Sequence, residues 1–257
     1  MNWFHRASVF HPTGKAGTGS VAGWTENEEL RGRVHVFRDR AEAGKSLARL
    51  LRDFHDSGAL VLAIPSGGVP VAAAIAEELD LPLDVAIVSK VTPSWNTEVG
   101  YGAVAFDGTV RIDEGRSRSL EITGAERQED VARAVHKVGR RAMLFRHGRP
   151  FPDLSKHTVI LVDDGLASGL TMEVAVEVLR KRGAKTILVA VPTGHLHAVE
   201  KLAGIAEGVY CANVRGGPQF AVAEAYEHWS DVAEVEAAEI LSKTQALVPA
   251  KQRRKIA

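Results

Sequence analysis

Two adjacent carboxylates, Asp163 and Asp164, follow four apolar residues and precede a turn of small residues in the stretch VILVDDGLASGLT, residues 159–171. Neighbouring carboxylates can accept hydrogen bonds from vicinal hydroxyls or ligate a divalent cation. The residues from Gly165 to Thr171 lead into a predicted helix. There, small side chains let backbone N–H groups converge, and the helix N-terminus favours an anion. The stretch therefore offers acceptors for a diol and donors for a phosphate, and a ribose 5-phosphate satisfies both.

The segments around this turn alternate between two patterns. Nearly all-apolar segments predict buried strands over residues 59–64, 83–88, 158–162, 186–191 and 209–214. Apolar residues at helical spacing predict helices from Asp39, over 70–79, from Thr123, over 171–182 and around 231–241. This alternation predicts an α/β fold with a mainly parallel central sheet and helices on both faces. Ligands of such sheets bind at the carboxyl ends of the strands, which is where Asp163 and Asp164 fall.

Local signals fix some of the boundaries. Thr123 and Glu126 have the spacing of a capping box at the start of a long helix. The predicted inner face of that helix consists of Val131, Val135, Val138, Ala142 and Phe145. Between two apolar segments, the pair Asp107-Gly108 predicts a hairpin with a type I′ turn.

The stretch 159–171 resembles the phosphoribosyl diphosphate (PRPP) binding signature of type I phosphoribosyltransferases, in which four apolar residues and two acids precede a loop ending in Gly-x-Thr. The resemblance implies that Asp163 and Asp164 contact the ribose hydroxyls. It also implies that the next loop holds the 5-phosphate, through Gly165, Ala167, Ser168, Gly169, Leu170 and Thr171. Ser168 stands where the family usually has Thr and keeps the hydroxyl. The plain alternative is a turn with a good helix cap, and the signature also occurs in PRPP synthetases and in regulators built on the same fold.

The family also binds pyrophosphate with a short loop after an earlier strand, often through a non-proline cis peptide. The segment PSGGVP occupies that place, which implies a pyrophosphate-binding role for Ser66, Gly67 and Gly68. Some relatives carry Arg-Gly-Gly here, so with Ser66 one positive charge is missing. Lys90, at the end of the second predicted strand, is placed to neutralise pyrophosphate. Without the resemblance, the segment is a plain turn and Lys90 a solvated charge.

Residues 91–113 fit the mobile loop of the family, a lid that closes over the reacting centre and excludes water. A polar stretch, VTPSWNTEVGY, and the hairpin that follows it suit such a lid. Glu98, Tyr101 and Arg111 are candidates for a direct role, with a structural or solvated role as the alternative for each.

Residues 213–229 fit the C-terminal hood with which the family recognises the base. Tyr226 and Trp229 either stack on the base or serve as core or interface aromatics. We expect three parts, an irregular N-terminal arm, a phosphoribosyltransferase-like domain and a basic, disordered tail, over residues 1–32, 33–242 and 243–257.

These residues together predict transfer of a 5-phosphoribosyl group from PRPP to a nitrogen acceptor, with a nucleobase as the leading candidate, and release of pyrophosphate. Asp163, Asp164 and Lys90 are the predicted catalytic residues, and the two acids are also the predicted Mg²⁺ ligands, directly or through water or ribose hydroxyls. The resemblance implies a homodimer. The alternative is a non-catalytic regulator that senses PRPP or a nucleotide, which Ser66 in place of Arg favours. A PRPP synthetase typically needs a longer chain with two related domains.

Composition narrows the function classes. The 257 residues include 32 basic and 32 acidic ones, so the formal net charge is zero and a nucleic-acid partner is not expected. Cys211 is the only cysteine, which excludes an intramolecular disulfide and a cysteine-rich zinc site. We see no apolar run of membrane-spanning length and no secretory signal at the N-terminus, and we expect a soluble, cytoplasmic protein.

Three other features resemble sites more weakly. GKAGTGS, residues 14–20, lacks the order of a P-loop and has no preceding strand. His195 and His197 are read as loop histidines, with a metal pair as the alternative. The basic residues of the C-terminal tail are read as a solvated end.

Overall fold

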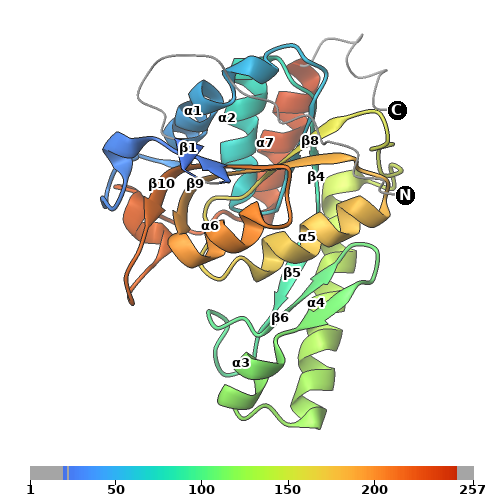
Figure 1. The fold of residues 1–257 in the computed structure, drawn as a ribbon. Coiled ribbons are helices and arrows are strands. Elements are labelled where there is room, and N and C mark those ends of the chain that lie inside the picture. Colours follow the sequence, from blue (N-terminus) through green and yellow to red (C-terminus); the bar gives the residue numbers. More distant parts are fainter. Residues whose placement is uncertain (1–19, 22, 248–257) are drawn as a thin grey trace, which may run out of the picture.

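The computed structural model of the chain describes residues 20–21 and 23–247. Its main sheet has seven strands in the order β1-β2-β10-β9-β8-β3-β4 (Figure 1). Within this described sheet only β1 is antiparallel to its neighbour, and the other six strands run parallel. The predicted α/β fold with a mainly parallel sheet is confirmed. The strands span Ser20–Val21 (β1), Trp24–Thr25 (β2), Leu60–Ala63 (β3), Leu83–Val85 (β4), Thr158–Val162 (β8), Thr186–His195 (β9) and Gly208–Arg215 (β10).

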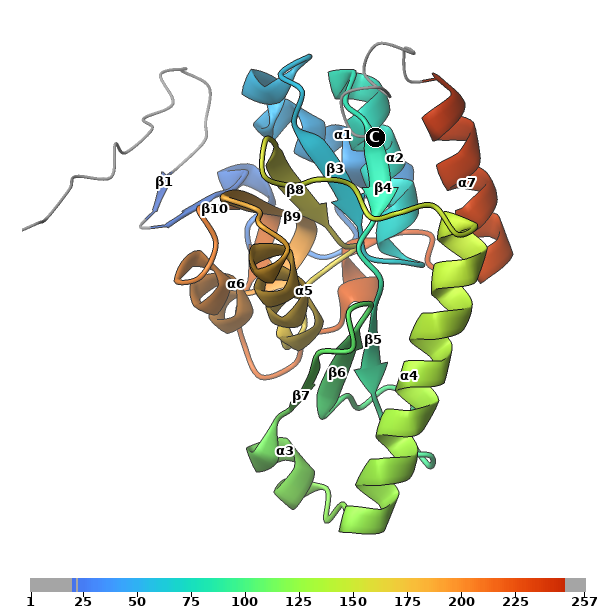
Figure 2. The ribbon, with the colours of Figure 1, turned by 90° about the vertical axis from the view of Figure 1, so that its right-hand side faces the viewer.

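Helices cover both faces of this sheet (Figure 2). On one face lie α1 (Arg40–Leu50), α2 (Gly68–Leu79) and α7 (Glu234–Leu247), and on the other lie α5 (Leu170–Lys181) and α6 (Leu196–Ala203). The strands are apolar on both sides because successive residues enter different cores: Val61 belongs to the cluster with α2, and Leu62 to the cluster with α5. Short 3₁₀ helices at Glu28–Leu30 (η1), Arg52–Phe54 (η2) and Val222–Ala225 (η3) complete the connections.

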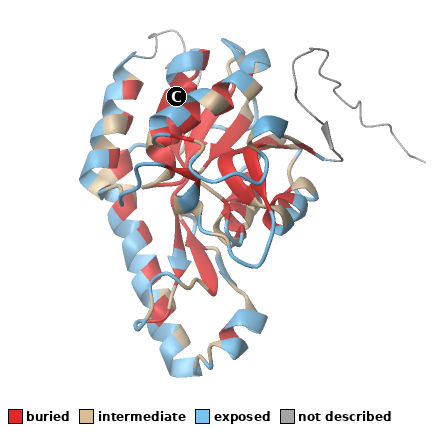
Figure 3. Cartoon of the chain, turned by 90° about the vertical axis from the view of Figure 1, so that its left-hand side faces the viewer, coloured by how far each residue is buried: buried red, intermediate tan, exposed pale blue. Residues whose placement is uncertain are grey.

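Between β4 and β8 the chain builds a projecting part, residues 88–146, which we call the extension. It contains the antiparallel strands β5 (Val88–Val91), β6 (Gly102–Ala105) and β7 (Val110–Ile112), then α3 (Glu114–Ser119) and α4 (Gly124–Arg146). Figures 2 and 3 show it protruding from the sheet body, with α4 running along its length towards α7.

The single strand predicted over 83–88 is wrong. β4 ends at Val85, and Ala86 and Ile87 carry the chain out of the main sheet into β5 of the extension. The sequence does not reveal this break, because Ala86 and Ile87 are apolar and as buried as the strands that they join. Lys90 therefore lies inside β5 and not at the end of a strand of the main sheet.

The hairpin of β6 and β7 forms, but its turn is not type I′. A type I′ turn needs a positive φ at both central residues, and only Gly108 has one, at 88°. The N–H of Gly108 donates to the carbonyl of Ala105, and the N–H of Ala105 donates to the carbonyl of Thr109. This is the longer loop in which a glycine of positive φ follows a turn, and Asp107 stabilises it by accepting from the N–H of Thr109 at 2.9 Å.

The capping box of α4 is confirmed, with hydrogen bonds in both directions between Thr123 and Glu126. Its predicted inner face is partly wrong. Val138 and Phe145 are buried, whereas Val135 is 48% exposed. The buried residues of α4 are instead Asp130, Ala134, Val138, Arg141, Phe145 and Arg146. An apolar pattern does not predict this set, because three of its members are charged and have buried partners.

The described part of the N-terminal arm contacts the sheet through β2, in which Trp24 is buried and which pairs with β10. At the other end α7 continues through Leu247, into the segment predicted as a disordered tail. Residues 14–19 of GKAGTGS and residues 248–257 of the tail lie outside the described residues. Within the described chain, none of the helices combines the length and apolar character needed to span a membrane.

Candidate active site

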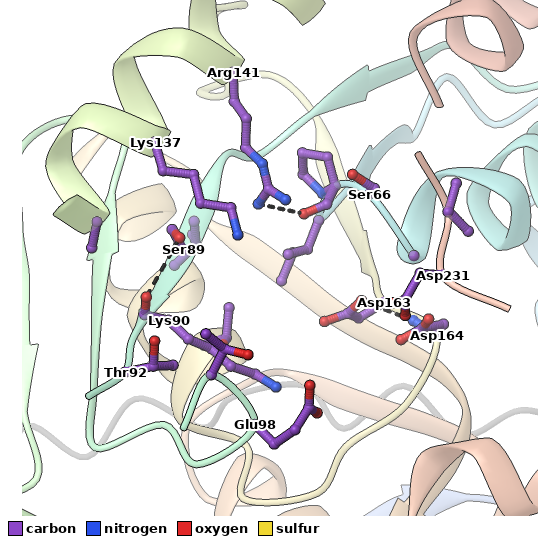
Figure 4. Close-up of a pocket in the computed structure, with 18 of the residues that line it drawn as sticks. Ser66, Ser89, Lys90, Thr92, Glu98, Lys137, Arg141, Asp163, Asp164 and Asp231 are labelled. Atoms are coloured by element: carbon purple, nitrogen blue, oxygen red, sulfur yellow. Dashed lines mark hydrogen bonds between the residues drawn. The ribbon is translucent and has the colours of Figure 1, made fainter. Parts of the chain in front are cut away.

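A cleft of about 590 Å³ lies between the sheet body and the extension. Its floor is the carboxyl end of β3 and β8, α4 and β5 form one side, and residues 229–232 form part of another. Figure 4 shows Asp163, Asp164 and Asp231 on one side of the cleft and Lys137 and Arg141 on the opposite side, with Lys90 and Glu98 near each other below them. The cations that line it are Arg40, Lys90, Arg133, Lys137 and Arg141.

Asp163 and Asp164 face this cleft directly after β8. A carboxylate oxygen of Asp163 accepts a hydrogen bond from the N–H of Asp164 at 2.9 Å. Burial raises the pKa of Asp163 well above its ordinary value, and the nearby charge of Asp164 adds to this effect. Burial also raises the pKa of Asp164, against the opposing charge of Arg40. The pair thus consists of two poorly solvated carboxyl groups, whose charged forms would be stabilised by ligand hydroxyls or by a cation.

Arg40 holds Asp164 in place. Its Nε donates to Oδ2 of Asp164 at 2.9 Å, and its Nη1 donates to the carbonyl of Ser230 at 2.8 Å. The guanidinium also lies 3.9 Å from the centre of the Trp229 ring. We did not predict this residue. One signal was available, because a cation in the first turn of a helix opposes the helix dipole and needs another reason to be there.

The two predicted base-binding aromatics have different environments. Tyr226 is only 1% exposed, does not line the cleft, and donates its hydroxyl to the carbonyl of Asp164 at 2.7 Å. Tyr226 therefore has the environment of a core aromatic, and its hydroxyl supports the backbone of the acidic pair. Trp229 is 37% exposed and lines the cleft, with the guanidinium of Arg40 over one face of its ring.

The predicted 5-phosphate loop follows the acids and enters α5. Leu166 anchors it, because its N–H and carbonyl bond to Thr193 and His195 of β9. Gly169 has a φ of 78°, which glycine adopts without strain, and Gly165 approaches Val222 so closely that a Cβ would lie 2.5 Å from its side chain. Ala167 and Ser168 are exposed and Leu170 begins α5, so the loop surrounds the helix N-terminus. Of these residues, Thr171 lines the cleft.

The predicted pyrophosphate loop lies beside the acids, after β3. Its Pro65–Ser66 peptide bond is cis. A Cβ on Gly67 would lie 2.1 Å from Oδ2 of Asp164, and one on Gly68 would lie 2.8 Å from the carbonyl of Val162. The two glycines are therefore required for this loop to contact the end of β8. Oγ of Ser66 is buried and has no hydrogen-bond partner among the described residues.

The three candidate residues of the predicted lid have different surroundings, and only one of them lines the cleft. Glu98 is exposed and lines the cleft together with Lys90. Tyr101 is buried and donates to Oδ2 of Asp130 at 2.6 Å, which ties β6 to α4. Arg111 forms two hydrogen bonds of 2.7 Å with Glu177 of α5 and does not line the cleft. Tyr101 and Arg111 are thus structural, the alternative that was left open for them.

Three cleft residues of α4 were not predicted. Arg133, Lys137 and Arg141 recur every four residues, which places them on one face of a helix. That spacing was visible in the sequence, but nothing in the sequence indicated that this face turns towards the acids.

A phosphoribosyl transferase domain model matches residues 39–210, which include both loops and the whole extension. The chain belongs to the phosphoribosyl transferase family. It is 33% identical over 210 residues to two curated proteins from Mycobacterium tuberculosis, of the strains CDC 1551 and H37Rv, each named "Putative phosphoribosyl transferase". The match covers 82% of this chain and 47% of each relative, so the chain spans about half their length.

The fold of this family member is also similar to the crystal structure of TT1426 from Thermus thermophilus. The two are 33% identical with a TM-score of 0.64, over 80% of this chain and 98% of the other.

The Mg²⁺ that the family resemblance implies fits the donors of this cleft in part. Asp163 and Asp164 are hard oxygen ligands in a poorly solvated site, which favours a divalent cation. No group of three or more His, Cys, Asp or Glu side chains able to hold a metal is found among the described residues. Mg²⁺ usually binds through one or two carboxylates plus substrate phosphates and water. The phosphoribosyl transferase cleft therefore fits a metal that arrives with its substrate.

Two other features take no part in this cleft. His195 ends β9, and its Nε2 lies 3.0 Å from the carbonyl of Gly217, so it has a structural partner. Cys211 is completely buried, and burial raises the pKa of its thiol far above the ordinary value. A buried, protonated thiol is a poor nucleophile.

Proposed function

We propose that this phosphoribosyl transferase domain transfers the 5-phosphoribosyl group of PRPP to a ring nitrogen of a nucleobase-like acceptor and releases pyrophosphate. One observation carries the proposal: the partly buried acidic pair Asp163–Asp164 faces a cleft between a helix-entrance loop and a second loop. The Ser66 hydroxyl of this second loop is buried without a partner among the described residues. A diol, a phosphate monoester and a diphosphate would satisfy these three features together.

The chemistry exchanges one bond at C1 of the ribose for another. The bond from C1 to the diphosphate oxygen breaks, and the leaving pyrophosphate keeps the electron pair. The acceptor nitrogen donates its lone pair to C1, and the proton that it loses passes to water. Positive charge grows on the sugar ring and negative charge on the leaving group, so the protein acts by positioning and by electrostatic stabilisation.

The residues divide this work by location. Asp163 and Asp164 accept from the ribose hydroxyls and favour the positive charge that grows on the ring. Backbone N–H groups at the start of α5 and the hydroxyl of Thr171 hold the 5-phosphate. Backbone donors of Ser66 and Gly67, together with Lys90, stabilise the pyrophosphate, and Trp229 offers its ring to the acceptor. Mg²⁺ held by Asp163 or Asp164 and the diphosphate oxygens would neutralise charge on the leaving group.

A test combines PRPP and Mg²⁺ with a panel of purines, pyrimidines and other nitrogen heterocycles. Pyrophosphate release is followed by a coupled phosphate assay, and the new nucleotide is identified by mass spectrometry. We expect pyrophosphate release that depends on one acceptor class. PRPP binding without release for any acceptor would favour the regulator alternative, and no PRPP binding would overturn the proposal.

A further inference from the structure

The cations of α4 that line the cleft do not have equivalent surroundings. Arg133 pairs with the buried Asp130, and Nε of Arg141 pairs with Glu234 at 2.9 Å. Lys137 lies between them on the same face, and its side chain has no hydrogen-bond or ion-pair partner among the described residues. Figure 4 shows its ammonium group pointing into the cleft beside Arg141.

The partnered arginine also places Lys137 relative to the pyrophosphate loop. Nη1 of Arg141 donates to the carbonyl of Pro65 at 3.0 Å, which fixes α4 against this loop. The next residue, Ser66, has a buried hydroxyl without a partner in the described chain and stands where some relatives carry Arg. Arg141, one helical turn after Lys137, therefore contacts the residue that precedes the position at which the loop itself provides no cation.

The charge around Lys137 is in excess. Burial lowers the pKa of Lys137, and the positive charges of Arg141, Arg140 and Lys90 lower it further, against the opposing effect of Glu234. The side chain of Lys90 likewise has no hydrogen-bond or ion-pair partner within the described chain. Two lysines from different elements thus face one cavity without a counter-charge in contact, and a bound polyanion would relieve their repulsion.

We propose that Lys137 binds the diphosphate of PRPP and supplies, from α4, the positive charge that Ser66 lacks. Arg141 is the positioning residue, because its hydrogen bond to Pro65 holds α4 against the loop. The inference rests on the proposed function for its ligand, PRPP. It adds that the pyrophosphate subsite is assembled from two parts of the molecule, the loop after β3 and the extension.

Calorimetric titrations of the whole chain test this assignment with inorganic pyrophosphate, PRPP and ribose 5-phosphate, each at a fixed Mg²⁺ concentration. For Lys137→Ala we expect affinity for pyrophosphate and PRPP to fall about tenfold to a hundredfold, the loss of one charged hydrogen bond. Ribose 5-phosphate affinity stays unchanged, because Asp163, Asp164 and the loop before α5 are intact. Lys137→Arg retains most of the pyrophosphate affinity.

The matched control is Lys185→Ala, which removes one exposed positive charge at the start of β9, at the opposite end of the strands. It should leave all three affinities unchanged. Equal losses in the two alanine variants would show an effect of net charge and overturn the assignment. Pyrophosphate binding that survives Lys137→Ala would also overturn it and leave the proposed function intact. A wild-type chain that binds pyrophosphate but not PRPP would instead contradict the proposed function.

Discussion

The two walls of the cleft are built in opposite ways. On the wall of the sheet body, Asp164 is held by Arg40 and Tyr226, and Arg40 is held by Ser230 and by the ring of Trp229. On the wall of the extension, the side chains of Lys90 and Lys137 have no hydrogen-bond or ion-pair partner among the described residues. The first wall is a closed network before any ligand binds, whereas the second carries two lysines without an ionic partner in contact.

This difference matches the chemistry proposed for each side. A sugar that must present C1 to an acceptor needs acids in a fixed geometry, and preorganised groups lose little free energy in reorganisation. A leaving diphosphate needs positive charge close to its oxygens as its own charge grows, and an ammonium group on a flexible side chain can supply it. We therefore expect substitutions in the closed network to have the larger effects.

Asp164→Asn tests the wall of the sheet body at the residue that Arg40 and Tyr226 hold in place, and it should have the largest effect. The amide keeps the size of the side chain but removes the charge that faces Arg40 and that is proposed to bind the ribose hydroxyls. We expect affinity for PRPP with Mg²⁺ to fall about a hundredfold in calorimetry, as for the loss of two charge-assisted hydrogen bonds. Asp107→Asn, at an exposed hairpin position, is the control and should bind normally. Unchanged PRPP affinity in Asp164→Asn would refute the role of the acidic pair.

Much of the closed wall was readable from the sequence, because its strand, acids and loop are contiguous. The stretch from Val159 to Thr171 predicts a strand, two carboxylates and a helix entrance at one sheet edge, and the structure has all of them there. Arg40 was missed because its partner is 124 residues away. Local patterns carry no information about a contact of that kind.

The structure of the extension was harder to predict from the sequence, also because local patterns were insufficient. Its strands are short, and the boundary between β4 and β5 lies within one continuous apolar segment. The buried face of α4 contains Asp130 and Arg141, which hydrophobic periodicity counts as solvent-facing. The spacing of Lys137 from Arg133 and Arg141 predicts that the three share one face of a helix, but it does not predict where that face points. The hydrogen bond from Arg141 to Pro65, which helps to orient this face towards the cleft, joins residues far apart in the sequence.

Gly67→Ala tests whether the closed wall tolerates any added volume. The new Cβ would lie 2.1 Å from Oδ2 of Asp164, so the loop or the carboxylate must shift. We expect a loss of about 1–3 kcal/mol in the free energy of unfolding, the usual cost of overpacking, together with weaker PRPP binding.

Gly139→Ala is the matched control for this substitution, because Gly139 lies within α4 and a Cβ there would have nothing within 4 Å. It should stabilise the chain by about 0.5–1 kcal/mol, since alanine favours a helix interior over glycine. Chemical denaturation of both variants gives the two values. A loss for Gly139→Ala as large as that for Gly67→Ala would remove the contrast between the walls.

Glu234→Gln tests the ion pairs that join the two walls, with the smallest expected effect. Glu234, in α7 of the sheet body, accepts hydrogen bonds from Arg140 and Arg141 of α4. Burial acts to raise the pKa of Glu234, but these arginines outweigh it and leave the pKa below its ordinary value. The carboxylate therefore stabilises the folded chain at neutral pH, and this contribution disappears as the pH falls through the lowered pKa.

Partly solvated pairs of this kind contribute up to about 1 kcal/mol, so denaturation at pH 7 should show a loss of that size for Glu234→Gln. The difference from the wild type should shrink steadily in strong acid. A difference that persists there would mean that Glu234 joins the walls by packing and not by charge.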